Sequence, residues 1–94
     1  MANLLDTRFS VSEELIRNIT ESLVQGLLQK MTEKGPGSFV HRHEIMGCIQ
    51  EEYHELIEAS HSRKPMALYS ELEDLAMAAI FSIASLRFID PSRR

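Results

Sequence analysis

Acidic residues occur in two pairs whose spacing puts both members on one side of an α-helix. Glu52 and Glu55 form the first pair, and Glu71 and Asp74 form the second. Residues three apart are neighbours on a helix surface. Carboxylates held side by side can bind a hard divalent cation or exchange protons with a substrate. Most such pairs are simply a solvated face, so the residues around them decide between these interpretations.

Turn signals divide the chain into three long segments. The stretches "KGPGS" at 34–38 and "SHSRKP" at 60–65 interrupt a sequence that contains few strand signals. We therefore predict one all-α domain over residues 1–94, built as a bundle of three main helices at about 11–34, 39–60 and 66–89.

Candidate capping residues mark the ends of these helices. Ser10 precedes Glu13 by three residues, the pattern of a capping box, and Gly35 is a typical helix stop. Ser38 is a candidate N-cap for the second helix. Pro65 suits the first turn of the third helix.

The first helix carries an ordinary apolar stripe that predicts packing and no chemistry. Its members recur at three-, four- and five-residue spacing and comprise Leu15, Ile16, Ile19, Leu23, Leu27 and Met31.

The acids of the second helix are not equivalent. Its apolar stripe consists of Ile45, Ile49, Tyr53 and Leu56. At about 100° per residue, Glu52 projects within this stripe and Glu55 lies at its edge, whereas Glu51 and Glu58 point away. Cys48 lies beside the stripe and is interpreted as a small core residue.

The third helix is apolar on nearly every side after Asp74, in the stretch "LAMAAIFSIA". A chain of 94 residues has difficulty covering such a helix completely. We therefore expect oligomerisation, as a homodimer or a homotetramer, to complete the bundle.

The two acidic pairs should meet between the second and third helices. The connecting loop is short, which favours an antiparallel pair of helices. At about 1.5 Å rise per residue, both pairs lie roughly 8–13 Å from the turn. Two like charges about 4 Å apart repel by about 4 kcal/mol at an effective dielectric near 20, and neither helix carries Lys or Arg on these faces. We therefore predict that Glu52, Glu55, Glu71 and Asp74 bind Mg²⁺ or Mn²⁺.

Composition excludes several classes of function. Ten Lys and Arg against 14 Asp and Glu give a net charge of −4, which argues against binding a nucleic acid polymer. The longest nearly uncharged run, residues 75–89, is interrupted by Arg87 and is too short for a membrane span. One cysteine and no signal peptide make a cytoplasmic protein the default expectation.

The acidic spacing resembles a family signature. The pattern "EExxE" from Glu51 to Glu55, followed by "ExxD" from Glu71 to Asp74, is similar to that of the MazG-like all-α nucleoside triphosphate pyrophosphohydrolases. The stretches "EEYHELIEA" and "ELEDLAMAAI" also look like the second and third helices of that family. The similarity covers about residues 43–86.

The resemblance implies an oligomeric enzyme that uses Mg²⁺ to split a (deoxy)nucleoside triphosphate into monophosphate and pyrophosphate, with nucleotide-pool house-cleaning as a role. It implies the same four metal ligands. Glu51 matches the motif as well, but its outward direction limits it to supporting the metal ligands or to acting as a catalytic base that orients water. Arg63 and Lys64, in the neighbouring loop, are candidates for binding the substrate phosphates.

Two alternatives stay open. The Glu51-x-x-His54 and Glu58-x-x-His61 spacings occur in carboxylate-bridged di-iron bundles, although there the two motifs lie on different helices. A non-catalytic helical interaction protein that retains the MazG-like fold is the other alternative.

Overall fold

Three α-helices make up the computed structural model, which describes residues 8–90. They are α1 (Glu13–Lys34), α2 (Arg42–His61) and α3 (Pro65–Ile89), and no strand occurs between residues 8 and 90. The predicted all-α class and the three-helix division are confirmed. None of the helices within these residues combines the length and the hydropathy needed to cross a bilayer.

The N-terminus of α1 is capped two residues later than predicted. The hydroxyl of Ser12, not that of Ser10, accepts a hydrogen bond from the Leu15 N–H at 3.0 Å. This cap puts Glu13 and Glu14 in the first turn, where they face the positive end of the helix dipole. The predicted stop is confirmed: Gly35 has a φ of 92°, and its N–H donates to the Met31 carbonyl at 2.8 Å.

The start of α2 also differs from the prediction, which placed the N-cap at Ser38. The cap is His41, whose Nδ1 accepts from the His43 N–H at 3.1 Å. The preceding loop is instead tied to α3. The Phe39 N–H donates to the Ser85 hydroxyl at 3.1 Å, which keeps this segment out of the first helical turn.

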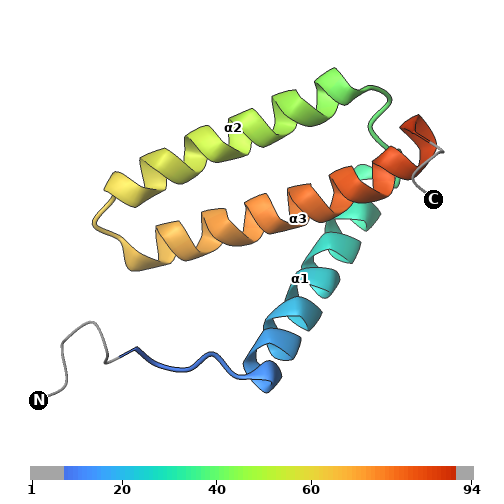
Figure 1. The fold of residues 1–94 in the computed structure, drawn as a ribbon. Coiled ribbons are helices and arrows are strands. Elements are labelled where there is room, and N and C mark those ends of the chain that lie inside the picture. Colours follow the sequence, from blue (N-terminus) through green and yellow to red (C-terminus); the bar gives the residue numbers. More distant parts are fainter. Residues whose placement is uncertain (1–7, 91–94) are drawn as a thin grey trace, which may run out of the picture.

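The helices α2 and α3 run antiparallel along each other, and α1 crosses α3 near the α1 C-terminus (Figure 1). Gly26 marks the close approach of α1 to α3, because a Cβ at this position would lie 3.1 Å from the Met77 sulfur. The N-terminal half of α1 leaves the bundle. Its stripe residues Leu15 and Ile16 are 48% and 51% exposed.

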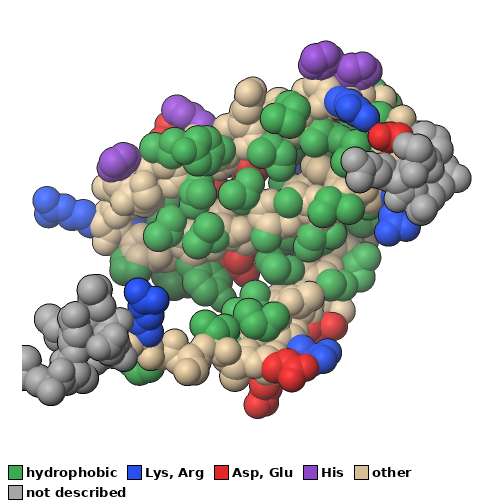
Figure 2. All heavy atoms as spheres, viewed as in Figure 1, with side chains coloured by type: hydrophobic (Ala, Val, Ile, Leu, Met, Phe, Trp, Pro, Cys, Tyr) green, Lys and Arg blue, Asp and Glu red, His purple; other side chains and the backbone are tan. Residues whose placement is uncertain are grey.

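The buried core is small. Among the described residues, the buried apolar side chains are Ile45, Ala59 and Met77, joined by the polar Ser82 and Ser85. Figure 2 shows hydrophobic side chains spread over the visible face of α2 and α3. The Cα radius of gyration is 16.5 Å, against about 12 Å for a compact domain of this length. The single chain is therefore an open arrangement of helices.

Candidate metal centre

Three of the four predicted ligands converge between α2 and α3. One carboxylate oxygen from each of Glu52, Glu55 and Glu71 lies within 4.8 Å of the other two. The first two side chains come from α2 and the third comes from α3, at matching distances from the turn that connects the helices. We call these three residues the acidic cluster.

The acidic cluster is partly withdrawn from water. All three side chains are half-buried, and the Oε2 atoms of Glu52 and Glu71 are inaccessible to solvent. Within residues 8–90, neither atom has a hydrogen-bond partner. A buried polar atom without a partner costs about 1–3 kcal/mol, and more if it is charged. The two oxygens are therefore placed where a positive charge would stabilise them.

Burial and repulsion raise the pKa of two members of the acidic cluster, Glu52 and Glu71. Burial raises the pKa of Glu52 most, and the negative charges of Glu55, Asp74 and Glu71 raise it further. Burial is also the main cause of the raised pKa of Glu71. Glu55 and Asp74 add to that shift by repulsion, and Glu55 adds to it by a hydrogen bond. The nearby Lys30 opposes both shifts.

The fourth predicted ligand, Asp74, is close to the acidic cluster but already has a basic partner. Its Oδ1 lies 3.2 Å from the Nζ of Lys30. The second and third helices carry no basic side chain on these faces, as predicted, but the acids are not without a basic neighbour. Lys30 comes from α1, which crosses α3 at this point.

Sequence reasoning missed Lys30, although a signal was present. Lys30 follows Leu23 and Leu27 at helical spacing, so a charge interrupts the apolar face of α1. Glu52 interrupts the apolar face of α2 in the same way. A positive charge on the apolar face of α1 and a negative charge on the apolar face of α2 indicate that these two faces lie close together.

Glu51 is exposed and lies outside the acidic cluster, in agreement with its predicted outward direction. Its role as a catalytic base stays a prediction.

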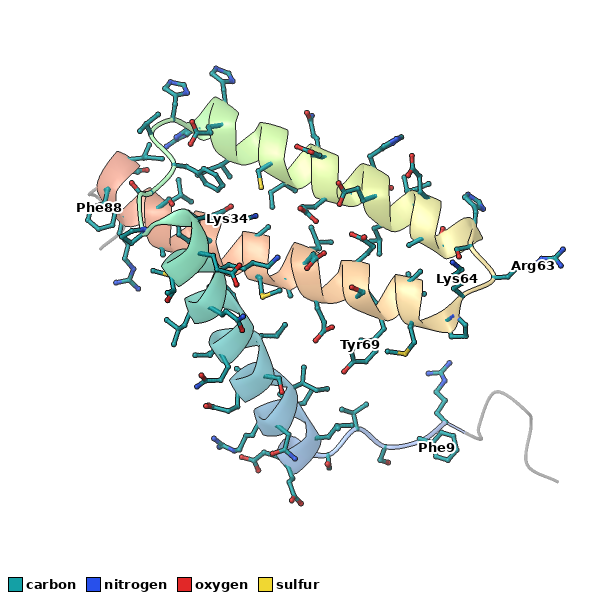
Figure 3. All side chains as sticks on the ribbon, turned by 180° about the vertical axis from the view of Figure 1, so that it is seen from behind. Phe9, Lys34, Arg63, Lys64, Tyr69 and Phe88 are labelled. Carbon is teal, nitrogen blue, oxygen red and sulfur yellow. The ribbon has the colours of Figure 1, made fainter. Side chains whose placement is uncertain are left out.

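The two candidates for phosphate binding lie at the turn between α2 and α3. Arg63 and Lys64 are both exposed, and Arg63 points away from the bundle (Figure 3). No ion pair within residues 8–90 joins either of them to the acidic cluster, so their proposed contact with phosphate stays a prediction.

Histidine is not part of the acidic cluster. His54 Nε2 lies 3.0 Å from Glu58 Oε1, and both side chains are about 70% exposed. In the described part of the chain, the group of side chains with metal-binding geometry contains carboxylates only. His54 and Glu58 therefore belong to a solvated face of α2, and the di-iron alternative has no structural support.

The donor set thus consists of three converging carboxylate oxygens, with a fourth carboxylate shared with a lysine. Such a set can hold a hard cation or share a proton. Comparisons of the chain with protein-family models, with curated proteins and with solved structures found no match.

Proposed function

We propose that the acidic cluster, together with Asp74, binds a catalytic divalent cation, Mg²⁺ or Mn²⁺. One observation carries this proposal: three carboxylate oxygens lie within 4.8 Å of one another, and two oxygens of the same side chains are buried without a partner. A cation between the helices would satisfy these oxygens and remove the repulsion that raises the pKa of Glu52 and Glu71.

The donor atoms fit such an ion in type and approximate size. Oxygen ligands suit Mg²⁺ and Mn²⁺, whereas zinc favours sites that contain His and Cys. In octahedral Mg²⁺ sites with bonds of about 2.1 Å, adjacent ligands are about 3 Å apart and opposite ligands about 4.2 Å apart. The oxygens of Glu52, Glu55 and Glu71 lie within 4.8 Å of one another, so they would move closer together to bind one ion.

We further propose that the protein hydrolyses (deoxy)nucleoside triphosphates to monophosphate and pyrophosphate in the cytoplasm, as the resemblance to MazG-like enzymes implies. The bound cation would supply positive charge to the triphosphate and to the leaving pyrophosphate. The acidic cluster and Asp74 would hold the ion, and Glu51, one helical turn before Glu55 on α2, would orient the attacking water and accept its proton. The water oxygen bonds to the α-phosphorus as the bond from that phosphorus to the bridging oxygen breaks. Removal of unwanted nucleotides from the cellular pool is the proposed role.

A pyrophosphate assay with Mg²⁺ and a panel of canonical and modified nucleoside triphosphates tests the activity. We expect equal amounts of monophosphate and pyrophosphate from at least one substrate. Glu52→Gln and Asp74→Asn should abolish the release, whereas the exposed Glu58→Gln should retain it. Absence of release from every substrate would refute the enzymatic proposal.

A homodimer or homotetramer is the proposed assembly. The chain exposes 7931 Å² of surface, against about 5,500 Å² for a compact monomer of its mass. The difference is in the range that one subunit loses in a permanent dimer. Large apolar side chains are exposed on both α1 and α3, including Ile16, Leu28, Leu72, Ile83 and Phe88.

The same exposed apolar surface supports the alternative, a non-catalytic helical interaction protein. The pyrophosphate assay separates the two functions. The alternative predicts assembly without release of pyrophosphate from any nucleotide.

A further inference from the structure

A cavity of about 320 Å³ adjoins the acidic cluster. The C-terminal end of α1, the loop that follows it, α2 and α3 all contribute to its walls. Glu52 and Asp74 line one part of it, so they belong both to the cavity and to the proposed metal centre. The volume is at the lower end of the range of small-ligand sites. If one end of a ligand binds at the metal centre, the rest of that ligand would lie next to this cavity.

Apolar side chains form most of the cavity wall. Phe39 and Phe81 meet edge to face with ring centroids 5.3 Å apart, and Met77 and Ala78 lie beside them. The hydrogen bond from the Phe39 N–H to Ser85 fixes the loop that carries one ring. This wall suits a flat, weakly polar body, since aromatic rings and a methionine sulfur pack well against such a surface.

Two cations lie on the α1 side of the same cavity. Lys30 and Lys34 are one helical turn apart and both line it. Figure 3 shows Lys34 at the end of α1, where this helix meets α3. Lys30 already reaches the acids through Asp74. The cavity therefore combines an apolar wall, an acidic part that can hold a cation, and two ammonium groups that can bind an anion.

We infer that this cavity receives the base and sugar of a nucleoside triphosphate, with Lys30 and Lys34 binding phosphate oxygens beside the metal centre. The inference rests on the proposed function and adds to it the site that accepts the organic part of the substrate. Phe39 provides an aromatic contact for the base because it lines the cavity, whereas the exposed Tyr53 and Tyr69 do not.

The lining also predicts how the base is selected. Apart from the four charged residues, the lining side chains offer only weak hydrogen-bonding groups: the thiol of Cys48, a weak donor, and the thioethers of Met31 and Met77, weak acceptors. Selection therefore depends on the size and apolar surface of the base. Burial of the thymine methyl group should make a thymidine nucleotide bind about fourfold more tightly than its uracil counterpart.

Cys48 offers a direct measurement, because it is the one cysteine of the chain and it lines the cavity. Its rate of alkylation by a maleimide should fall severalfold when Mg²⁺ and the α,β-methylene analogue of thymidine triphosphate are added. This analogue resists cleavage between the α- and β-phosphates, so binding is measured without turnover. Burial raises the pKa of the Cys48 thiol, and the negative charges of Glu52, Glu51 and Glu55 raise it further, so the buffer must be alkaline enough to supply the thiolate that reacts. The rate with Mg²⁺ alone is the reference, because a cation at these carboxylates offsets their charge.

A matched pair of substitutions on α3 locates the binding. Ala78→Leu fills the cavity, whereas Ala84→Leu places the same side chain on an exposed part of the helix. We expect Ala78→Leu to weaken nucleotide binding about tenfold and to remove the protection of Cys48, while Mg²⁺ still raises Tm. Ala84→Leu should behave like the wild type. The protection in the wild-type protein remains informative even if Ala78→Leu fails to fold.

The outcomes separate this inference from the enzymatic proposal. Protection of Cys48 without release of pyrophosphate would support the cavity as a nucleotide site and refute the hydrolysis. Release of pyrophosphate without protection of Cys48, and with an unchanged KM in Ala78→Leu, would support the hydrolysis and overturn the cavity as the substrate site.

Discussion

Lys30 Nζ lies 3.2 Å from Asp74 Oδ1, and this contact links α1 to the acidic residues of α2 and α3. The side chains are 42% and 32% exposed, so water screens the pair only in part. The charge of Lys30 also lowers the pKa of Glu52 and Glu71, against the larger effects of burial and of neighbouring carboxylates. The position of α1 on α3 is therefore coupled to the charge of the acidic cluster.

Substitution of Lys30 should reveal this coupling. In Lys30→Gln, the acids lose their nearby positive charge, so we expect the metal-free protein to lose about 0.2–1 kcal/mol of stability and a few degrees in Tm. The affinity for Mg²⁺ should rise, because no ammonium group competes for Asp74. Thermal melting in EDTA and calorimetric titration with Mg²⁺ measure the two effects.

Arg17→Gln is the matched control for Lys30→Gln. Arg17 lies on the same helix and pairs with Glu13 at 2.7 Å, far along α1 from the acidic cluster. The Arg17→Gln substitution should leave the affinity for Mg²⁺ unchanged. An equal change in that affinity in both variants would contradict a specific role for Lys30.

The stability of the metal-free protein should depend on pH in a direction set by Glu52 and Glu71. Both have a raised pKa, so the folded state binds more protons than the unfolded state above their ordinary value of 4.5. Their contribution to stability is complete below that value and is lost as the pH rises through the raised pKa.

The double variant Glu52→Gln/Glu71→Gln isolates this contribution. We expect it to be more stable than the wild type at neutral pH without metal, and the advantage should shrink as the pH falls toward 4.5. Urea unfolding at a series of pH values measures the difference. A constant difference at all pH values would show that the two carboxylates do not titrate as described.

Sequence patterns predicted the acidic cluster because local geometry determines it. Helical periodicity fixed the inward direction of Glu52 and Glu55, and the short turn fixed their height relative to Glu71. The contact of Lys30 with Asp74 depends on how α1 crosses α3, which the pattern of neither helix specifies. The start of α2 was misplaced for a similar reason, since the loop at Phe39 is anchored to a distant residue, Ser85.

The apolar stripe of α1 was predicted to pack against the rest of the protein, but no other helix of the described chain covers its N-terminal half. Leu15, Ile16 and Ile19 are between 39% and 51% exposed. If a second copy covers this surface, Ile19→Glu should shift the assembly to monomers, because it would bury a charge. Light scattering after size-exclusion chromatography measures the mass. Gln25→Glu, at an exposed position on the other side of α1, should leave the assembly intact. A monomeric wild-type protein at micromolar concentration would contradict the proposal.

Gly35 and Gly37 form a matched pair for the loop that leads from α1 to the cavity. Gly35 has a φ of 92°, a conformation that side chains disfavour, whereas the φ of Gly37 is not positive. A Cβ has open space at both positions. Gly35→Ala should therefore cost about 1–3 kcal/mol by backbone strain, and Gly37→Ala should cost far less. Equal midpoints of urea unfolding for the two variants would contradict this account.

Binding of a divalent cation by the acidic cluster is the central claim, and titration with Mn²⁺ followed by electron paramagnetic resonance tests it most directly. We predict that the wild-type protein binds Mn²⁺ and that Mg²⁺ displaces it. Glu52→Gln and Glu71→Gln should each weaken binding by about tenfold or more, since even residues that only support metal ligands contribute that much. Glu58→Gln, which alters an exposed acid of α2, should bind like the wild type. Equal Mn²⁺ affinity in all four proteins, or no binding by the wild type, would contradict the account.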